Sequence, residues 1–268
     1  MTALDHPFRV LPRVPSAARR SWRLVERNYA SSRGAWLVVL SGFFEPFFYL
    51  AALGIGVGAL VGDLDVGGRT VPYREFVAPA LLAASAMNGA IYESGNIFFK
   101  LKWARTYEGV LATPLTVRDV AVGELLYTLI RGLVYCVGFV AVMGALGLVT
   151  TPWVILAVPA AALVSAAFAA AAVYAITLMR SWADFAFVDA CAMPMFLFSA
   201  TFVPAAEYPD VARWVLPFTP LYHGVELLRA FTLADVGPHV FANAGYLVAM
   251  TVVFLLLADR RLAKLLLK

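Results

Sequence analysis

The sequence predicts an all-α polytopic membrane protein with six transmembrane helices, and three observations support that fold class. First, 62% of the 268 residues are hydrophobic and 14% are charged, whereas soluble domains hold roughly 45–50% apolar and about 25% charged residues. Second, six apolar stretches are each long enough to cross a hydrocarbon core of roughly 30 Å as a helix. Third, the basic residues gather in segments that would share one side of the membrane. This composition excludes a soluble enzyme, a disordered protein and a secreted disulfide scaffold.

Residues 1–35 are predicted to be a cytoplasmic segment containing an amphipathic helix that lies in the membrane interface. Ala18, Trp22, Val25 and Tyr29 recur at helical spacing, and arginines fall on the opposite side. Aromatic residues on one face and arginines on the other are typical of interfacial helices. We expect this helix to anchor the chain on anionic membrane lipids or to act as an elbow that docks a partner, and the two roles are compatible.

The transmembrane domain is predicted to cover residues 36–258, followed by a basic cytoplasmic tail at 259–268. The apolar runs are continuous, which is typical of helices and not of barrel strands. The predicted spans are Trp36–Leu60, Phe76–Phe99, Val120–Leu148, Trp153–Met179, Phe185–Val203 and Val240–Ala258.

The basic residues also predict the orientation, because cytoplasmic loops of membrane proteins carry an excess of Lys and Arg. With the N-terminus inside, sixteen of the 21 Lys and Arg residues lie on the cytoplasmic side and four lie outside. Both termini are therefore expected in the cytoplasm, and the 61–75 connection is expected to be a short polar loop outside. The net charge of +4 reports orientation, so no nucleic-acid partner is expected.

The loop between the second and third spans, about residues 100–119, is longer than a connection needs. Trp103, Tyr107, Val110 and Leu111 recur at helical spacing, and Pro114 is expected to end the helix because it lacks an N–H group. A short amphipathic helix outside the bilayer suits insertion into a groove on a partner. The same pattern also fits a loop that rests on lipid headgroups.

Residues from about 204 to 238 are half apolar and interrupted by prolines, and neither half is long enough to span. Short helices of this kind at the membrane edge predict a re-entrant helical hairpin on the outside, which is tolerated only where protein buries it. The hairpin is expected to gate the exit of a path or to serve only as a lid. Its candidate gate residues are Pro220, His223, Glu226 and Arg229, although His223 and the Glu226–Arg229 pair also fit structural roles.

Ionisable residues within spans are functional candidates, because a charge in the membrane is costly unless it is paired or near water. Arg131 is the deepest, and we expect it to pair with Glu45 or Glu93. A structural ion pair is the favoured interpretation, ahead of a polar lining for a substrate headgroup and of proton coupling. Glu124 lies near the inner boundary, where solvation alone would satisfy it. The candidate path residues are Glu45, Glu93, Glu124, Arg131, Phe44, Phe48 and Phe198.

Three blocks of the sequence resemble the ABC type-2 exporter permeases, most closely the nodulation-factor and daunorubicin-export branch. The resemblance spans essentially the whole chain, and the blocks occur in the order found in that family. They are Arg105–Leu115 followed by Gly123-Glu124-Leu125, then Phe198–Pro204, then Pro217–Ala230.

The resemblance implies six transmembrane helices and a coupling helix, in the loop after the second, that docks on a nucleotide-binding ATPase subunit. ATP and Mg²⁺ would bind to that partner, since this chain has no Gly-x-x-x-x-Gly-Lys-Ser/Thr phosphate loop; no cofactor and no metal is expected here. A second permease, either a copy or a paralogue, would complete the path. The implied contacts with the ATPase are Arg105, Tyr107, Glu108, Gly109, Leu111, Ala112, Thr113, Pro114 and Leu115.

The predicted function is therefore the permease subunit of an ATP-driven exporter in the cytoplasmic membrane of a bacterium. An amphipathic, lipid-like or drug-like substrate fits the aromatic, lightly charged spans. An ATP-independent secondary transporter or channel and an intramembrane enzyme are the alternatives. Neither is favoured, because the chain has no matching pair of broken helices and no His-Glu-x-x-His or Gly-x-Ser-Gly motif, and no catalytic residue is expected.

Overall fold

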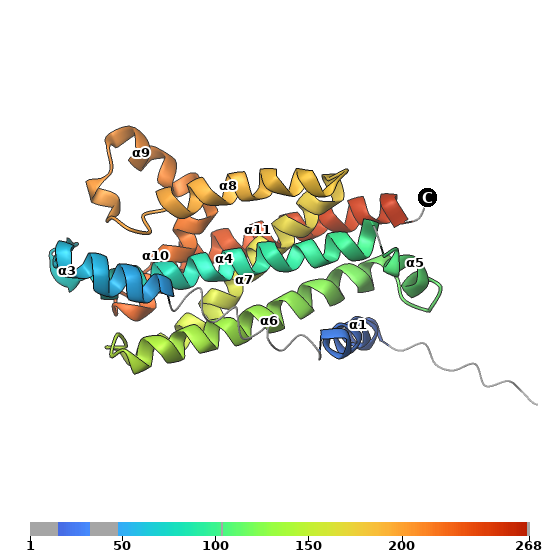
Figure 1. The fold of residues 1–268 in the computed structure, drawn as a ribbon, viewed down its shortest axis with the longest axis horizontal. Coiled ribbons are helices and arrows are strands. Elements are labelled where there is room, and N and C mark those ends of the chain that lie inside the picture. Colours follow the sequence, from blue (N-terminus) through green and yellow to red (C-terminus); the bar gives the residue numbers. More distant parts are fainter. Residues whose placement is uncertain (1–15, 33–47, 103, 267–268) are drawn as a thin grey trace, which may run out of the picture.

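Four of the apolar stretches fold as long helices, whose interior backbone N–H and C=O groups pair with one another without help from water. The computed structural model describes residues 16–32, 48–102 and 104–266. Its long helices run side by side along one axis and form an elongated bundle (Figure 1). These helices are α4 (Tyr73–Lys102), α6 (Val117–Ala145), α7 (Ala157–Leu178) and α11 (His239–Leu266).

Among the described residues, three helices are both long and apolar enough to cross a membrane: Val117–Ala145, Pro152–Leu178 and His239–Leu265. They correspond to the third, fourth and sixth predicted spans. The second predicted span, Phe76–Phe99, lies entirely within α4, which is continuous over 30 residues despite the proline at position 79. Four of the six predicted spans are thus parts of uninterrupted helical segments.

The first and fifth predicted spans differ from expectation. The fifth is shorter than predicted: α8 is helical only over Phe185–Phe198, about 21 Å at 1.5 Å per residue, because the chain bends at residues 199–203. Most of the first, residues 36–47, lies outside the described residues. Its remainder forms a π-helical segment, η1 (Leu50–Val57), and the short helix α3 (Gly58–Val61). The count of six spans therefore stays a prediction.

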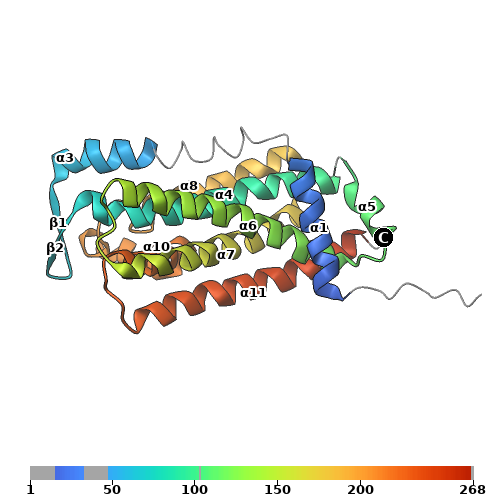
Figure 2. The same ribbon diagram turned by 90° about the horizontal axis from the view of Figure 1, so that it is seen from below.

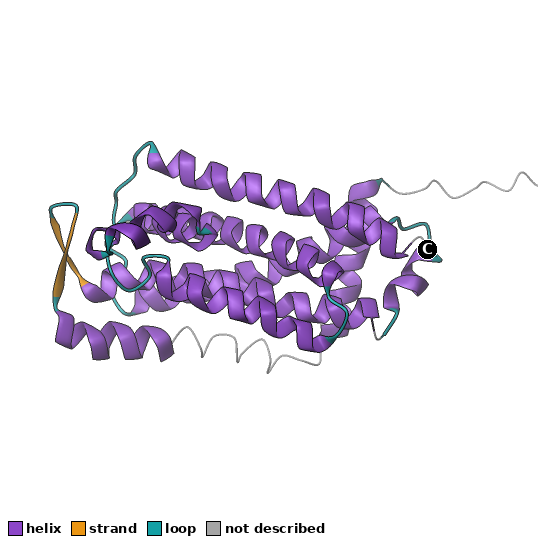
Figure 3. Ribbon diagram, turned by 90° about the horizontal axis from the view of Figure 1, so that it is seen from above, coloured by secondary structure: helices purple, strands orange, loops and turns teal. Residues whose placement is uncertain are grey.

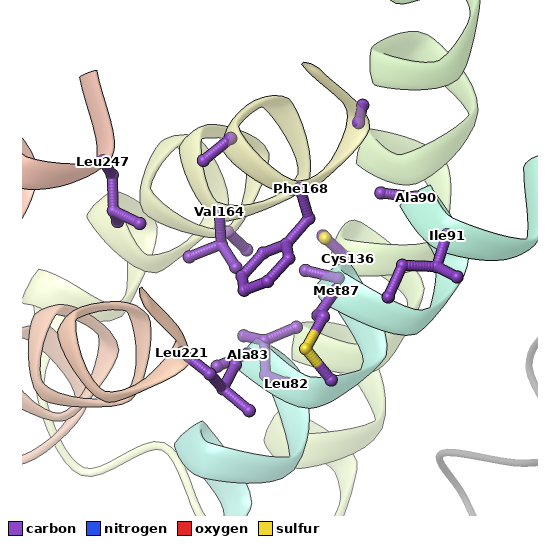
Figure 4. Close-up of a cluster of buried hydrophobic side chains, with 14 of the residues drawn as sticks. Leu82, Ala83, Met87, Ala90, Ile91, Cys136, Val164, Phe168, Leu221 and Leu247 are labelled. Carbon is purple, nitrogen blue, oxygen red and sulfur yellow. The ribbon is translucent and has the colours of Figure 1, made fainter. Parts of the chain in front are cut away.

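Helix α7 lies at the centre, in contact with α4, α6, α11 and α10 (Pro220–Thr232). Alanines along α7 leave room for its neighbours to approach closely. Val164 and Phe168 of α7 are buried together with Met87 of α4 and Leu221 of α10 (Figure 4). This part of the core is apolar, and several of the charged groups described below lie toward the two ends of the bundle.

One end of the bundle, called the hairpin end below, carries a β-hairpin that the sequence analysis expected only as a polar loop (Figure 3). Strands β1 (Asp63–Val66) and β2 (Arg69–Pro72) pair antiparallel, with the last residue of β1 opposite the first of β2. Gly67 and Gly68 form the two-residue turn, and both have positive φ (61° and 80°), a conformation that glycine adopts without strain.

Two short helices lie within residues 204–238 at the same end, in the segment where a re-entrant hairpin is predicted. Helix α9 (Asp210–Val215) follows Pro209, and α10 begins at Pro220, since proline suits the first turn of a helix, where its missing N–H is not needed. Whether this pair enters the membrane stays a prediction. The described residues also include four short 3₁₀ segments: η2 (Pro152–Leu156), η3 (Trp182–Asp184), η4 (Ala205–Glu207) and η5 (Leu216–Phe218).

The opposite end, called the α5 end below, holds the segments that the sequence placed outside the bilayer. Helix α1 (Ala17–Ser32) crosses α6 there, and α5 (Thr106–Leu111) lies beside the last turns of α11 (Figure 2). The described start of the chain and its described end thus lie at the same end of the bundle. This agrees with the predicted topology, in which both termini lie on the same side of the membrane. Which side of the membrane that is stays a prediction.

Candidate functional site

Helix α5 has one face in the core and one face in solvent. Tyr107 and Val110 are buried, whereas Arg105 and Glu108 are exposed and lie 3.8 Å apart in an ion pair. Arg105 precedes the helix in a left-handed backbone conformation (φ 43°), which interrupts the helical geometry between α4 and α5. A helix of six residues therefore lies within the predicted coupling loop, and its apolar residues Tyr107 and Val110 face the bundle; its role as a coupling helix stays a prediction.

The turn after α5 extends its exposed side. The helix ends at Leu111, and the hydroxyl of Thr113 donates to the carbonyl of Val110 at 2.6 Å. Leu111 and Leu115 are half-buried, so they support the turn from beneath. The exposed residues, called the α5 face below, are Arg105, Glu108, Gly109, Ala112, Thr113 and Pro114.

Tyr107 fixes α5 to the bundle. Its side chain is 1% exposed and belongs to the main core. Burial raises the pKa of its phenol well above the ordinary value, and the carboxylate of Glu124 adds to the increase. The hydroxyl makes no hydrogen bond within the described residues, so Tyr107 contributes mainly as an apolar anchor. Trp103, the other aromatic residue expected to anchor this helix, lies outside the described residues.

Helix α6 begins with a capping box that follows directly from the α5 turn. The Asp119 N–H donates to the hydroxyl of Thr116 at 3.2 Å, and the Thr116 N–H donates to the carboxylate of Asp119 at 2.9 Å. The same carboxylate accepts a hydrogen bond from Arg20 of α1 at 2.8 Å. Helix α1 is thereby bound to the residue that starts α6.

A second polar cluster joins α1, α4 and α6. Lys100 Nζ lies 2.9 Å from the carboxylate of Glu124 and 3.2 Å from the amide oxygen of Asn28, and the Asn28 amide donates to Glu124 at 2.9 Å. Glu124 is 2% exposed, so the suggestion that solvent satisfies it is wrong. A buried carboxylate stays charged at low cost only when cations and donors surround it, and Lys100 and Asn28 provide both.

The close packing of α1 on α6 requires a glycine. A Cβ at Gly123 would lie 2.8 Å from the side chain of Leu24 and 2.9 Å from the carbonyl of Ser21. The face of α1 that packs on the bundle therefore contains Ser21, Leu24, Val25 and Asn28. Trp22 and Tyr29, which the sequence placed on the same apolar face as Val25, stay at least half exposed.

Arg131 pairs with Glu93, one of its two expected partners, at 2.5 Å. Asn96 donates to the other oxygen of Glu93 at 3.2 Å, and Arg131 also donates to the hydroxyl of Tyr135 at 3.3 Å. The pair ties α4 to α6 and leaves Arg131 partly exposed. Glu45, the other expected partner, and Phe44 lie outside the described residues. The use of these charges as a substrate path stays a prediction.

The family model for the "ABC-2 type transporter" matches residues 19–233. The chain belongs to this family of membrane-integral permeases. The ABC-2 type transporter region includes α1, α5 and both polar clusters of the α5 end, and continues to the end of α10.

Curated relatives of this ABC-2 permease cover nearly its whole length. "Nodulation protein J" of Sinorhizobium fredii is 33% identical over 223 residues, which are 82% of each chain. The protein of the same name from Rhizobium leguminosarum bv. trifolii is 33% identical over 252 residues, 91% of this chain and 93% of the relative. That of Bradyrhizobium diazoefficiens is 30% identical over 259 residues, 94% and 97% of the two chains.

At the hairpin end of the permease, Arg229 is a buried clamp. Its guanidinium donates to the carbonyls of Ala200 (2.6 Å), Thr201 (3.2 Å) and Phe76 (3.3 Å), and it pairs with Glu226 at 3.1 Å. The cation also lies 3.7 Å from the centre of the Phe76 ring. Arg229 thus joins the start of α4, the bend after α8 and α10. This geometry fits the structural role considered for the pair, and a gating role stays a prediction.

His223 joins α10 to α11. Its Nε2 lies 2.8 Å from the carbonyl of Pro217, to which it must donate, and its Nδ1 lies 2.8 Å from the side-chain oxygen assigned to Asn243. The ring stacks on Tyr246 at 3.9 Å between centres. Both ring nitrogens therefore have protein partners, as a structural histidine does. The aromatic path candidates Phe48 and Phe198 are instead exposed, at 62% and 59%.

The structure brings some predicted site residues together and separates others. Six of the nine predicted α5 contacts lie together on the α5 face, whereas Tyr107 is buried and Leu111 and Leu115 are half-buried. Glu93 and Arg131 touch, but the gate candidates lie at the far end of the bundle. Reasoning from the sequence missed Arg20, Asn28, Lys100 and Asp119, whose roles depend on the docking of α1 onto α6. The available signal was the polar residue Asn28 on the same helical face as Leu24 and Val25, where an apolar residue is expected.

Proposed function

We propose that this permease is the transmembrane subunit of an ATP-driven exporter and that a separate nucleotide-binding subunit docks on the α5 face. The observation that carries the proposal is the division of α5 into a buried Tyr107 side and an exposed side. A helix of six residues cannot hold its shape alone, so the core contact of Tyr107 presents the exposed side as a preformed surface.

The proposal also explains how movement of the partner reaches the bundle. The α5 face continues into Thr116 and Asp119, which start α6 and bind α1 through Arg20. A displacement of α5 therefore acts on α6 and α1 together. ATP and Mg²⁺ would stay in the partner, and the two clusters at the α5 end would transmit force without chemistry of their own.

The exported molecule is proposed to be amphipathic, lipid-like or drug-like, and a second permease, a copy or a paralogue, is proposed to complete its path. Support comes from α8, where Phe187, Met193 and Phe198 are 59–73% exposed. Side chains of this kind suit either lipid or a second apolar subunit. In this arrangement both termini face the cytoplasm of a bacterium, and the hairpin end faces outward.

The docking proposal is tested by reversing one charge on the α5 face. Glu108→Arg is expected to reduce recovery of the nucleotide-binding subunit with the tagged permease at least fivefold, because Glu108 is exposed and central on the face. The matched control is Asp63→Arg, the same charge reversal at an exposed position of the hairpin end. If both variants retain the ATPase subunit as the wild type does, the α5 face is not the docking surface.

A further inference from the structure

A cavity of about 660 Å³ lies at the α5 end between α1, α4 and α6. Its volume lies within the range of small-molecule sites, roughly 300–1,000 Å³. The walls include Asn28 and Glu93, which are 2% and 8% exposed, so part of the lining belongs to the interior of the bundle while the cavity itself opens to the surface. Thr106, the first residue of α5, also belongs to the lining.

The charges around the cavity do not cancel. Three cations line it, Arg27, Lys100 and Arg131, against one lining carboxylate, Glu93. Arg131 is paired with Glu93, and Lys100 is paired with Glu124 behind the wall. Arg27 makes no ion pair with any other described residue. Counted over the described part of the chain, the cavity therefore keeps one uncompensated positive charge next to donors, which favours an anion.

The remaining lining suits the polar end of an amphiphile. Asn96 and Ser31 offer hydrogen-bonding groups, and the hydroxyls of Ser32 and Tyr127 lie 2.6 Å apart. Phe99 is 49% exposed at the same cavity, an apolar surface beside a charged one. A free anion gains nothing from contact with that apolar surface, whereas an acyl chain attached to an anionic headgroup can pack against it.

We propose that this cavity binds the anionic headgroup, a phosphate or sulfate ester, of an amphiphile held in the adjacent membrane leaflet, with Arg27 as the residue that neutralises it. Lys100 and Arg131 add donors while keeping their own carboxylates. The amphiphile is a resident phospholipid or the exported molecule at the start of its path. The second source rests on the proposed export function, and the first does not.

Native mass spectrometry of the full-length permease tests the site. The protein is released from vesicles of phosphatidylcholine and phosphatidylglycerol at four to one, and the bound phosphatidylglycerol is counted. Arg27→Gln is expected to weaken its retention about tenfold, because a charge-assisted hydrogen bond is lost. Arg19→Gln, on the same helix but exposed and outside the lining, makes the same change in net charge and should retain the lipid.

A second variant guards against misfolding of Arg27→Gln. Ser31→Asp places a negative charge at the cavity without removing any residue of the two polar clusters, and it should also weaken retention, whereas Ser31→Asn should not. Equal retention by Arg27→Gln, Ser31→Asp and Arg19→Gln would overturn the proposal. So would equal retention of phosphatidylcholine and phosphatidylglycerol by the wild type.

The two possible sources of the amphiphile are distinguished by measuring the ATPase rate of the complex of permease and ATPase subunit in discs of neutral phosphatidylcholine. If the site receives the exported molecule, dodecyl phosphate should stimulate the wild type at least twofold and leave Arg27→Gln unchanged. If it holds a resident phospholipid, retention depends on Arg27 while dodecyl phosphate has no such effect. Failure to assemble with an ATPase subunit would count against the proposed function, and the lipid-retention result would stand apart from it.

Discussion

Single residues set the packing at the two ends of this molecule, Gly123 at the α5 end and Arg229 at the hairpin end. Gly123 contributes by having no side chain, since Leu24 and the Ser21 carbonyl occupy the space that a Cβ would need. Arg229 contributes through its fork of donors, which meets backbone carbonyls of two segments far apart along the chain, at Phe76 and at Ala200 and Thr201. Neither role is visible as a pattern in the sequence, because each depends on segments that are far away along the chain.

Gly123→Ala should lower the stability of the permease by about 1–3 kcal/mol, because the added methyl group forces α1 away from α6. The midpoint of thermal unfolding in detergent measures the change. Gly245→Ala in α11 is the matched control, since nothing lies within 4 Å of a Cβ there and alanine favours a helix over glycine by roughly 1 kcal/mol. A fall of similar size in both variants would refute close packing at Gly123.

At the scale of elements, the start of α6 is the point where α5, α6 and α1 are joined. The capping box of Thr116 and Asp119 pairs two backbone N–H groups at the start of the helix, those of Thr116 and Asp119, and the Asp119 carboxylate also accepts a hydrogen bond from Arg20. Helix α1 is thus fixed by its attachment to a helix terminus as well as by its apolar face. Loosening that terminus should loosen α1.

Thr116→Ala should cost about 1 kcal/mol of stability through loss of the cap, and it should also increase the rate at which a protease cuts the α1 region. Limited proteolysis followed by mass mapping detects the second effect. Thr113→Ala serves as the comparison, since the Thr113 hydroxyl bonds to a carbonyl within the α5 turn and does not touch α1. If Thr116→Ala is cleaved at the same rate as the wild type, the cap does not contribute to the docking of α1.

The sequence predicted those elements whose causes are local. The spacing of Tyr107 and Val110 and the stop at Pro114 identified α5, and the cost of a deep charge identified a carboxylate partner for Arg131. The bend at residues 199–203 was missed because the apolar run continues through it. The β-hairpin was missed although the Gly67-Gly68 pair is a recognised turn signal. The Lys100–Glu124–Asn28 cluster could not be predicted, because it exists only once α1 has docked.

At the scale of the whole molecule, the two ends are built differently. The α5 end gathers charged clusters, a cavity and an exposed face, while the hairpin end is held by Arg229 and His223 through backbone carbonyls and a neighbouring helix. Between them the core around α7 is apolar. This division is consistent with the proposed docking and headgroup sites at the α5 end, and the exposed side of α8 is the proposed surface for a second permease.

The native cysteines allow that surface to be tested by cross-linking the wild-type chain, with two serine variants as controls. Cys191 of α8 is exposed and Cys136 of α6 is buried, so a short bis-maleimide should cross-link two copies through Cys191 alone if α8 faces its counterpart. Electrophoresis of wild-type membranes should show a band at twice the monomer mass. Cys191→Ser should abolish it and Cys136→Ser should not. A band that persists in Cys191→Ser would contradict the proposed seam.

The attachments of α8 have a mechanical consequence. Near the α5 end, Trp182 just before α8 stacks on Phe185 at 5.3 Å and packs against Phe98, and at the hairpin end Arg229 holds the bend that follows the helix. Between these fixed points α8 makes few contacts with other elements in the part of the chain that the structure describes, and Pro194 interrupts its hydrogen bonding. The helix is thus held at both ends and less firmly in its middle. Sideways bowing is therefore its softest mode of deformation, so its midpoint can shift while both anchorages stay in place.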